Sequence, residues 1–156
     1  MKIDQGNFSK PLLELLKETF EVHQGAYLDK NTSLFTTLES ISAEQASMPV
    51  GGNCATLAAQ LEHIIYYLEV LEKVVTAQDV GILDWDEIWQ RVNTVSTQEW
   101  ADQQARLKVV YKRIQAFFEN IEDWEAHDEA IGGAMAIVVH SAYHLGEIRQ
   151  ALCILE

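Results

Sequence analysis

His140 and His144 are the residues of this chain whose types and spacing point most directly to chemistry. They stand four positions apart in the C-terminal segment AIVVHSAYHLGEIRQALCIL. On a helix, side chains at this spacing project from one face about a turn apart, so the two imidazoles could bind one metal ion together. The spacing alone is a weak signal, because a chain with five histidines yields such a pair by chance at an appreciable rate.

The residues around this pair strengthen the metal hypothesis. The neighbours are apolar, namely Ile137, Val138, Val139, Ala142, Leu145 and Ile148. An unpaired imidazole buried among them would cost about 1 to 3 kcal/mol of desolvation, which a shared ion would remove. A tight site needs a third ligand, and His63 is the best placed because it lies midway along another apolar helical pattern. The alternative is that His63 is a core or interface histidine bonded to a carbonyl group.

Helices must position these side chains. Apolar residues recur at helical spacing almost throughout, and no stretch alternates as a half-buried strand does. Main helices are expected over Pro11–Val22, from an N-cap at Asn53 to about Thr76, from an N-cap at Ser96 to about Asn120, and over Glu129–Leu155. A shorter segment follows Ser33, and a connection of about twenty residues spans 77–95. Four main helices with this long crossover predict an all-α four-helix bundle, whose most apolar helix, the last, should lie deep.

Two capping signals mark helix starts in this pattern. Ser42 with Gln45, and Ser96 with Glu99, have the spacing of a capping box. In such a box the serine hydroxyl accepts a hydrogen bond from the backbone N–H of the Glu or Gln. The Glu or Gln side chain in turn accepts one from the backbone N–H of the serine. We therefore expect a short helical turn after Ser42 and a long helix after Ser96.

Length and composition limit the classes of protein. The chain has 156 residues, about the size of one domain, so a single domain over residues 1–156 is expected. Its net charge of −13 should repel phosphate backbones and anionic lipid surfaces, so neither nucleic acid nor membrane is an expected partner. No apolar run has the length of a signal peptide or a membrane span, which favours a cytoplasmic location. Cys54 and Cys153 are predicted to be buried thiols.

The segment HSAYHLGEIRQAL resembles the HxxxHxGxIRQ helix of the DinB-like superfamily. The segment AAQLEHIIYYLEVLEKV is similar to the second helix of that family, which carries a single ligand histidine. The order of the two motifs is similar as well. The likeness extends less tightly to FTTLESISAEQASMPVGG and VNTVSTQEWADQQARL, and so covers most of the chain from about Leu34 onward.

The resemblance implies an up-down-down-up four-helix bundle with a pocket at one end, a three-histidine metal site and frequent dimerisation, so a homodimer is expected. Carried over by position, the ligands are His63, His140 and His144. Family members of known activity include metal-dependent enzymes that use a low-molecular-weight thiol as cosubstrate. Where the family often has Gln or a small residue, this chain has Glu147, which could accept a hydrogen bond from a ligand, act as a fourth ligand or be solvated.

The favoured hypothesis is a metal-dependent enzyme that acts on a small molecule by thiol transfer or hydrolysis. An ion held by three imidazoles with open positions can polarise a bound water or deprotonate a bound thiol. Imidazole ligands suit several metals, of which we expect zinc or nickel first and iron next. The alternatives are a non-catalytic bundle that stores, senses or is stabilised by metal, and a pocket that binds a ligand without metal.

Several other residues carry weaker expectations. One of Tyr66 and Tyr67 could face the metal site, although core packing explains both equally well. Trp85 and Trp89 could cover a pocket or pack over helix ends. His23 and His127 are predicted at the surface, and Arg149, in a helix that looks buried, is predicted to pair with a carboxylate. HExxH and ExxH motifs are absent, which argues against a zincin and a carboxylate-bridged di-iron bundle.

Overall fold

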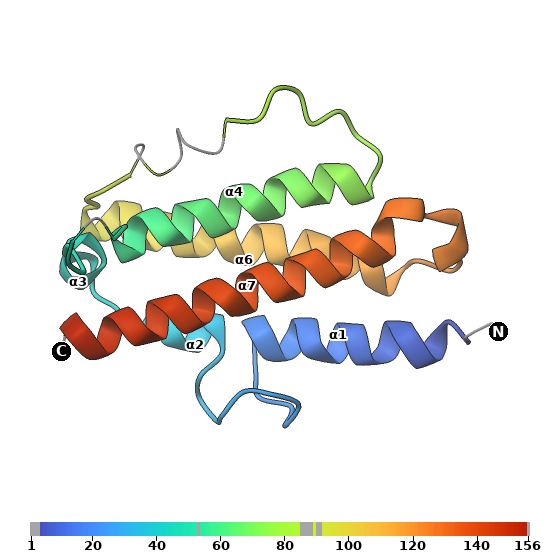
Figure 1. Cartoon of the computed structure of the whole chain (residues 1–156), viewed down its shortest axis with the longest axis horizontal. Helices are drawn as coiled ribbons and strands as arrows, with labels where there is room; N and C mark the ends of the chain where they lie inside the picture. The colour runs from blue at the N-terminus through green and yellow to red at the C-terminus, as the bar shows by residue number, and fades with distance from the viewer. Residues whose placement is uncertain (1–3, 53, 85–88, 90–91, 156) are drawn as a thin grey trace.

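The computed structural model of the chain is all-helical (Figure 1). It describes residues 4–52, 54–84, 89 and 92–155, and this part of the chain contains no strand. The four long helices are α1 (Gly6–Phe20), α4 (Leu57–Val75), α6 (Thr97–Glu119) and α7 (Asp128–Leu155). The shorter elements are α2 (Leu34–Glu39), α3 (Ala43–Ser47) and the 3₁₀ turn η1 (Trp124–Ala126). None of the described helices combines the length and apolar content that a bilayer span requires.

The long helices lie alongside one another. α4 packs against α6 and α7, and α1 packs against the other side of α6 and α7. Figure 1 shows α1 and α7 running in one direction and α4 and α6 in the other. Because α4 and α6 run in the same direction, the connection between them has to return along the length of the molecule, and residues 76–84 lead that way in Figure 1.

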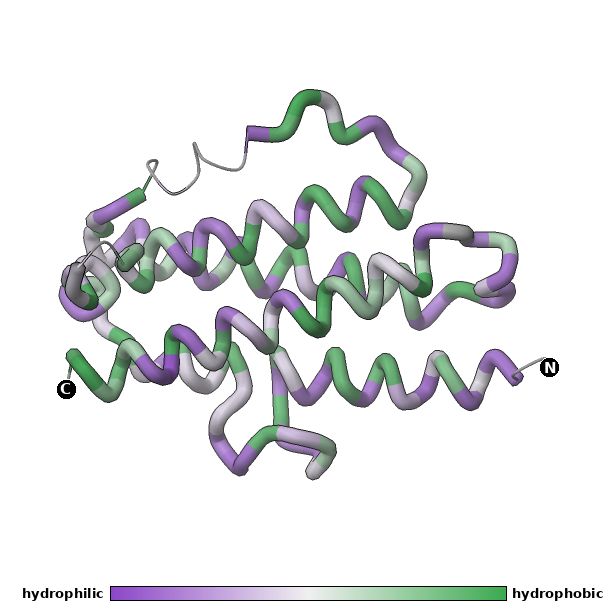
Figure 2. The backbone as a smooth tube through the Cα atoms, in the orientation of Figure 1, coloured by the Kyte–Doolittle hydropathy of each residue, from purple (hydrophilic) through white to green (hydrophobic). Residues whose placement is uncertain are grey.

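The core forms where the apolar faces of these helices meet. Hydrophobic positions recur along each long helix (Figure 2). In α4, Leu61, Ile64, Ile65 and Leu68 are among those with no exposed surface. Tyr111 of α6 stacks on Phe20 of α1 with 4.6 Å between ring centroids, so aromatic packing also joins α1 to α6.

Both predicted capping boxes are confirmed. The Ser42 hydroxyl accepts from the backbone N–H of Gln45, whose side chain accepts from the N–H of Ser42. Ser96 and Glu99 make the same exchange at the start of α6. Each box satisfies N–H groups that the first helical turn leaves without an intrahelical partner.

Two predicted helix starts are wrong. α4 begins at Leu57 and its N-cap is Thr56, whose hydroxyl accepts from the N–H of Ala59, whereas Asn53 lies outside the described residues. α1 begins at Gly6 and not at Pro11. The residues before Pro11 are mostly small and polar and read as a loop, but Phe8 packs edge-on against Trp124 at 5.6 Å. This distant contact stabilises a turn that local sequence does not predict.

The last helix lies less deep than its composition suggests. One side of α7 is buried in the core, but the other leaves Met135 51% exposed, Val139 68% and Tyr143 61%. Arg149 is also exposed, so it does not need the partner predicted for a buried cation. Both cysteines are exposed and free, which corrects the prediction of buried thiols. Cys54 lies in the irregular segment before α4, and Cys153 lies near the end of α7.

Two features fix α4 against the helices beside it. Arg106 of α6 reaches both Glu62 and Glu69 of α4, at 2.9 and 2.7 Å. On the other side, Gly133 of α7 lies so close to Val75 that a Cβ atom there would overlap the valine side chain. These contacts hold α4 in place between α6 and α7.

Candidate metal centre

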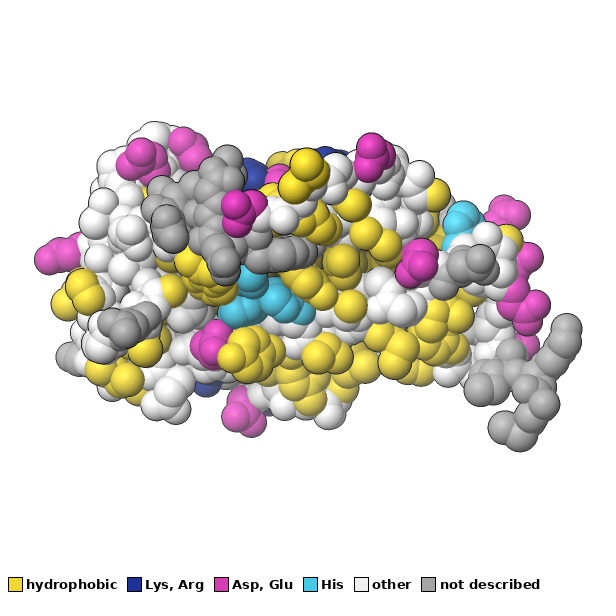
Figure 3. Space-filling view, turned by 45° about the horizontal axis from the view of Figure 1, so that its top comes forward, with side chains coloured by type: hydrophobic (Ala, Val, Ile, Leu, Met, Phe, Trp, Pro, Cys, Tyr) yellow, Lys and Arg dark blue, Asp and Glu magenta, His cyan; other side chains and the backbone are white. Residues whose placement is uncertain are grey.

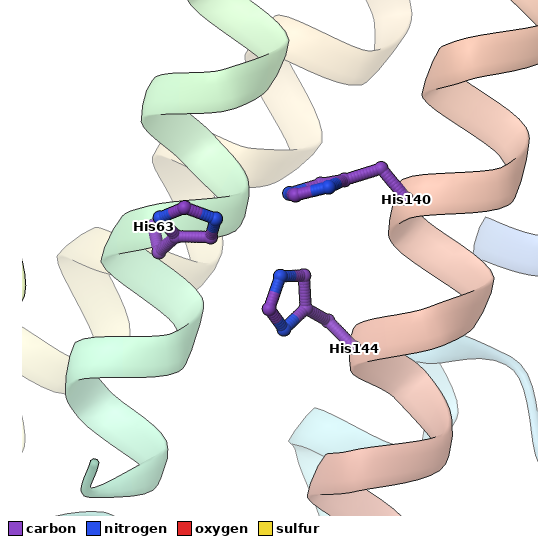
Figure 4. A group of neighbouring side chains, drawn as sticks. All are labelled: His63, His140 and His144. Carbon is purple, nitrogen blue, oxygen red and sulfur yellow. The ribbon is translucent and has the colours of Figure 1, made fainter. Parts of the chain in front are cut away.

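The three predicted ligands converge. Figure 4 shows the ring of His63 projecting from α4 and the rings of His140 and His144 projecting from α7 into the space between the two helices. One ligand atom from each ring lies within 4.8 Å of the other two. The ring centroids are 5.1 Å apart for His63 and His140, 4.9 Å for His63 and His144, and 4.5 Å for His140 and His144. The three histidines are therefore close enough to bind one metal ion.

The packing of α4 on α7 brings them together. His63 occupies the middle of α4, and the other two histidines occupy successive turns of α7. Four-residue spacing puts His140 and His144 one above the other, as the sequence predicted. Their neighbours Ile137, Leu145 and Ile148 are buried in the core and set the rotation of α7 about its axis.

Burial keeps these imidazoles uncharged. His63 and His144 are 7% and 4% exposed, and His140 is half-buried. Desolvation, with a smaller contribution from His144, lowers the pKa of His63 from 6.5 to about 4. Desolvation, together with the other two histidines, lowers the pKa of His140 to about 3. Desolvation also lowers the pKa of His144, against the opposing effect of Glu147. Neutral imidazole is the form that coordinates metals.

His140 has a buried nitrogen that suits a metal. Its Nε2 has no hydrogen-bond partner among the described residues, although nearly all buried polar atoms in proteins have one. Tyr67 stacks on the same ring, with 3.6 Å between centroids and an angle of 16°. The tyrosine therefore faces the site and covers one face of the His140 ring. A divalent ion would satisfy this nitrogen.

Glu147 orients His144. Its carboxylate accepts a hydrogen bond from Nδ1 of His144 at 2.8 Å. A carboxylate accepts hydrogen bonds, so Nδ1 carries the proton and Nε2 keeps the lone pair that a metal requires. The sequence left three roles possible for Glu147. This geometry matches the first, in which Glu147 accepts a hydrogen bond from a ligand histidine and fixes its orientation. Glu147 also raises the pKa of the exposed Tyr143 through a hydrogen bond.

Aromatic rings surround the histidines. Trp89, from the crossover, stacks on His63 with 4.2 Å between centroids. It therefore covers the site, which was one of the two roles predicted for it. Trp85 lies outside the described residues. Tyr143 packs edge-on against His144 at 5.0 Å, a contact that the sequence analysis missed. No local sequence signal predicts it, because residues adjacent on a helix do not face the same side. Tyr66 lines a different cavity, beside Glu69 and Arg113.

A cavity of about 700 Å³ shares lining residues with the surroundings of the histidines, although none of the three histidines is among the described residues that line it. Trp89, Tyr143 and Glu147, which contact the histidine rings, also line this cavity. Figure 3 shows histidine side chains grouped at the surface and bordered by hydrophobic side chains. A small molecule in the cavity would therefore lie next to the candidate metal centre.

The remaining histidines lie elsewhere. His127 is exposed, as predicted, and its ring packs edge-on against Phe117 at 6.0 Å. His23 is half-buried, with Nδ1 3.6 Å from the carboxylate of Glu18, so its predicted surface position is only partly right. Neither residue belongs to the three-histidine group.

Comparison of the chain with family models, with curated proteins and with solved structures finds no match.

Proposed function

We propose that this chain is a metal-dependent enzyme of the DinB-like kind that acts on a small molecule. The observation that carries the proposal is the convergence of two buried imidazoles and one half-buried imidazole, the last of which has a buried nitrogen with no hydrogen-bond partner among the described residues. His63, His140 and His144 would hold one divalent ion, with zinc or nickel favoured and iron as a further candidate. Such an ion, when bound with open positions, supplies Lewis acidity and lowers the pKa of a water or thiol bound to it.

The surrounding residues would prepare the site for that chemistry. Glu147 holds the ring of His144 with Nε2 facing the other two histidines. Trp89 and Tyr67 cover the rings of His63 and His140 and keep water from those faces. Glu147 is the only carboxylate among the described residues that line the cavity, and His144 engages it. This arrangement favours thiol transfer or hydrolysis without a separate side chain as general base.

Elemental analysis of protein isolated without a histidine tag tests the metal. We expect one divalent first-row ion per chain in the wild type and none after His63→Ala, His140→Ala or His144→Ala. His127→Ala is the matched control, because it removes an exposed histidine outside the group, and it should keep the ion. A wild-type protein that binds no such ion at one per chain would overturn the proposal.

The competing hypothesis is a bundle whose histidines bind metal without catalysis. His144→Ala distinguishes the two, read by circular dichroism and by turnover in a screen of thiol-transfer and hydrolysis substrates. An intact fold with lost turnover supports the enzyme. A wild type that is inactive throughout the screen, with a variant that no longer folds, supports a structural metal.

The topology and assembly implied by the DinB-like resemblance also belong to the proposal. The opposed directions of α1 and α7 against α4 and α6 support an up-down-down-up four-helix bundle (Figure 1). The exposed apolar side of α7 supports a homodimer, since such a surface commonly marks a contact between proteins. We place the protein in the cytoplasm, and a low-molecular-weight thiol remains one candidate cosubstrate.

A further inference from the structure

The lining of the cavity next to the histidines limits what can occupy it. Most of its inner surface is apolar, with Val50, Ala151 and Ile154 among the residues that provide it. A volume of about 700 Å³ lies within the range of small-molecule sites. Its occupant should therefore bury mainly hydrocarbon surface.

One buried polar group stands in this apolar lining. Gln60 lies on α4, one turn before His63, and is 8% exposed. Its Oε1 has no hydrogen-bond partner among the described residues. A buried carbonyl oxygen without a donor is costly, whereas a ligand N–H or O–H placed there would satisfy it. Because Gln60 is also a lining residue of the cavity, its oxygen is the buried group there that a ligand donor would satisfy.

The charges around the cavity argue against an anionic occupant. Among the described residues that line it there is no Lys or Arg, and Glu147 contributes a carboxylate. The chain as a whole carries a net charge of −13. In the metal-free chain, a carboxylate or phosphate in this cavity would lose its hydration without gaining a cationic side chain as a partner.

We propose that the cavity binds an uncharged, mainly apolar small molecule that donates a hydrogen bond to Oε1 of Gln60. The inference rests on the proposed function, because it names the substrate class of the same site. It assigns Gln60 to substrate recognition, beside the ligand His63. A thiol that carries carboxylate groups is not the occupant of this cavity.

Three matched probes test the substrate class on the full-length chain after removal of metal with EDTA. These are 4-phenylbutanamide, its N,N-dimethyl analogue and 4-phenylbutanoate, with affinities measured by calorimetry or ligand-observed NMR. The primary amide can donate to Gln60 and the dimethylamide cannot, so we expect the primary amide to bind about tenfold more tightly. The carboxylate should bind most weakly. Without metal, its affinity cannot come from coordination to an ion.

Variants assign the binding to this cavity. Gln60→Leu should abolish the difference between the two amides and keep the fold, since it replaces a buried unpaired polar group by an apolar one. Gly146→Leu should weaken both amides at least tenfold, because Gly146 lines the cavity and a side chain there meets open space. Gly132→Leu is the matched control, an exposed glycine of the same helix outside the lining, and it should bind like wild type.

The outcomes separate this inference from the metal proposal. Equal affinities of the two amides in wild type, tightest binding of the carboxylate, or no effect of Gly146→Leu would overturn the substrate class even if the protein binds zinc. If the affinities follow the expected order in a protein that binds no metal, the ligand pocket is supported and the proposed metal-dependent enzyme is refuted. Both measurements use the same purified protein.

Discussion

Burial of the three imidazoles sets how their metal affinity responds to pH. Protons compete with a metal only below the pKa of the ligand, and the pKa values of His63 and His140 are lowered from 6.5 to about 4 and about 3. Since the lowered pKa favours the neutral ring, His63 and His140 stay ready to bind a metal well below pH 6.5, and burial shifts the pKa of His144 in the same direction. We expect zinc affinity to change little from about pH 7.5 to about pH 6 and to fall steeply only below about pH 5.

Chelator-competition titrations with zinc at several pH values measure this dependence. An exposed three-histidine peptide serves as the reference, and its affinity should already decline near pH 6.5. A protein whose affinity falls in parallel with the peptide would show that burial does not protect its imidazoles from protons.

Glu147 should strengthen the metal site from behind His144. Its carboxylate accepts a hydrogen bond from Nδ1–H of His144, which fixes the ring and makes Nε2 a better electron-pair donor to a metal. Glu147→Gln should weaken zinc binding about 10- to 100-fold, the range typical of such partners. Glu129→Gln, an exposed position on the same helix, is the control and should leave zinc affinity unchanged. Equal affinities of the two variants would assign Glu147 to the solvent.

The sequence predicts the ligands better than their surroundings. His63, His140 and His144 were predictable because helical spacing and apolar neighbours place them on buried faces that can meet. Gln60 was not, because nothing in a sequence shows that a buried amide lacks a partner. Tyr143 was not either, since its contact with His144 depends on which side of α7 remains uncovered.

Adjacent glycines of α7 separate helix packing from helix propensity. Gly133 faces α4, where an added Cβ would overlap Val75, whereas Gly132 is exposed with nothing near it. Gly133→Ala should lower the free energy of unfolding by about 1 to 3 kcal/mol. Gly132→Ala should raise it by about 0.5 to 1 kcal/mol, because alanine restricts the unfolded chain and favours the helix.

Urea unfolding followed by circular dichroism gives both values. The double variant Val75→Ala/Gly133→Ala should be more stable than the sum of its single changes predicts, since shortening the valine makes room for the new methyl group. Similar effects of both glycine substitutions would mean that α4 and α7 do not approach closely at Gly133.

Helix starts show why boundaries are harder to predict than helices. The boxes at Ser42 and Ser96 were predictable because both partners lie within three residues in sequence. α1 was not, since the contact of Phe8 with Trp124 joins positions far apart in the chain. For α4 the sequence analysis predicts a cap at Asn53, whereas the cap is Thr56, and both residue types are favoured at N-caps.

Across the molecule, the basic residues of α6 partly offset an excess of acid. Arg106 bridges Glu62 and Glu69, Arg113 pairs with Glu72, and Lys108 pairs with Glu39. These pairs join α6 to α4 and α2, so the few cations neutralise glutamates between elements. The remaining net charge of −13 disfavours association of like chains except through a surface that is mainly apolar.

The exposed side of α7 is such a surface. Ile131, Met135, Val139 and Tyr143 follow one another at four-residue spacing, and each is between 38% and 68% exposed. They form a strip that extends about 18 Å along the helix, given a rise of about 1.5 Å per residue. If two copies pair through this strip, Val139→Glu would bury a carboxylate in the contact, and at micromolar concentrations we expect it to convert a dimer into a monomer.

Sedimentation velocity measures the assembly. Val109→Glu is the control, because Val109 is a similarly exposed valine on α6, and it should remain dimeric. A monomeric wild type, or equal dissociation by both substitutions, would place the contact elsewhere or remove it.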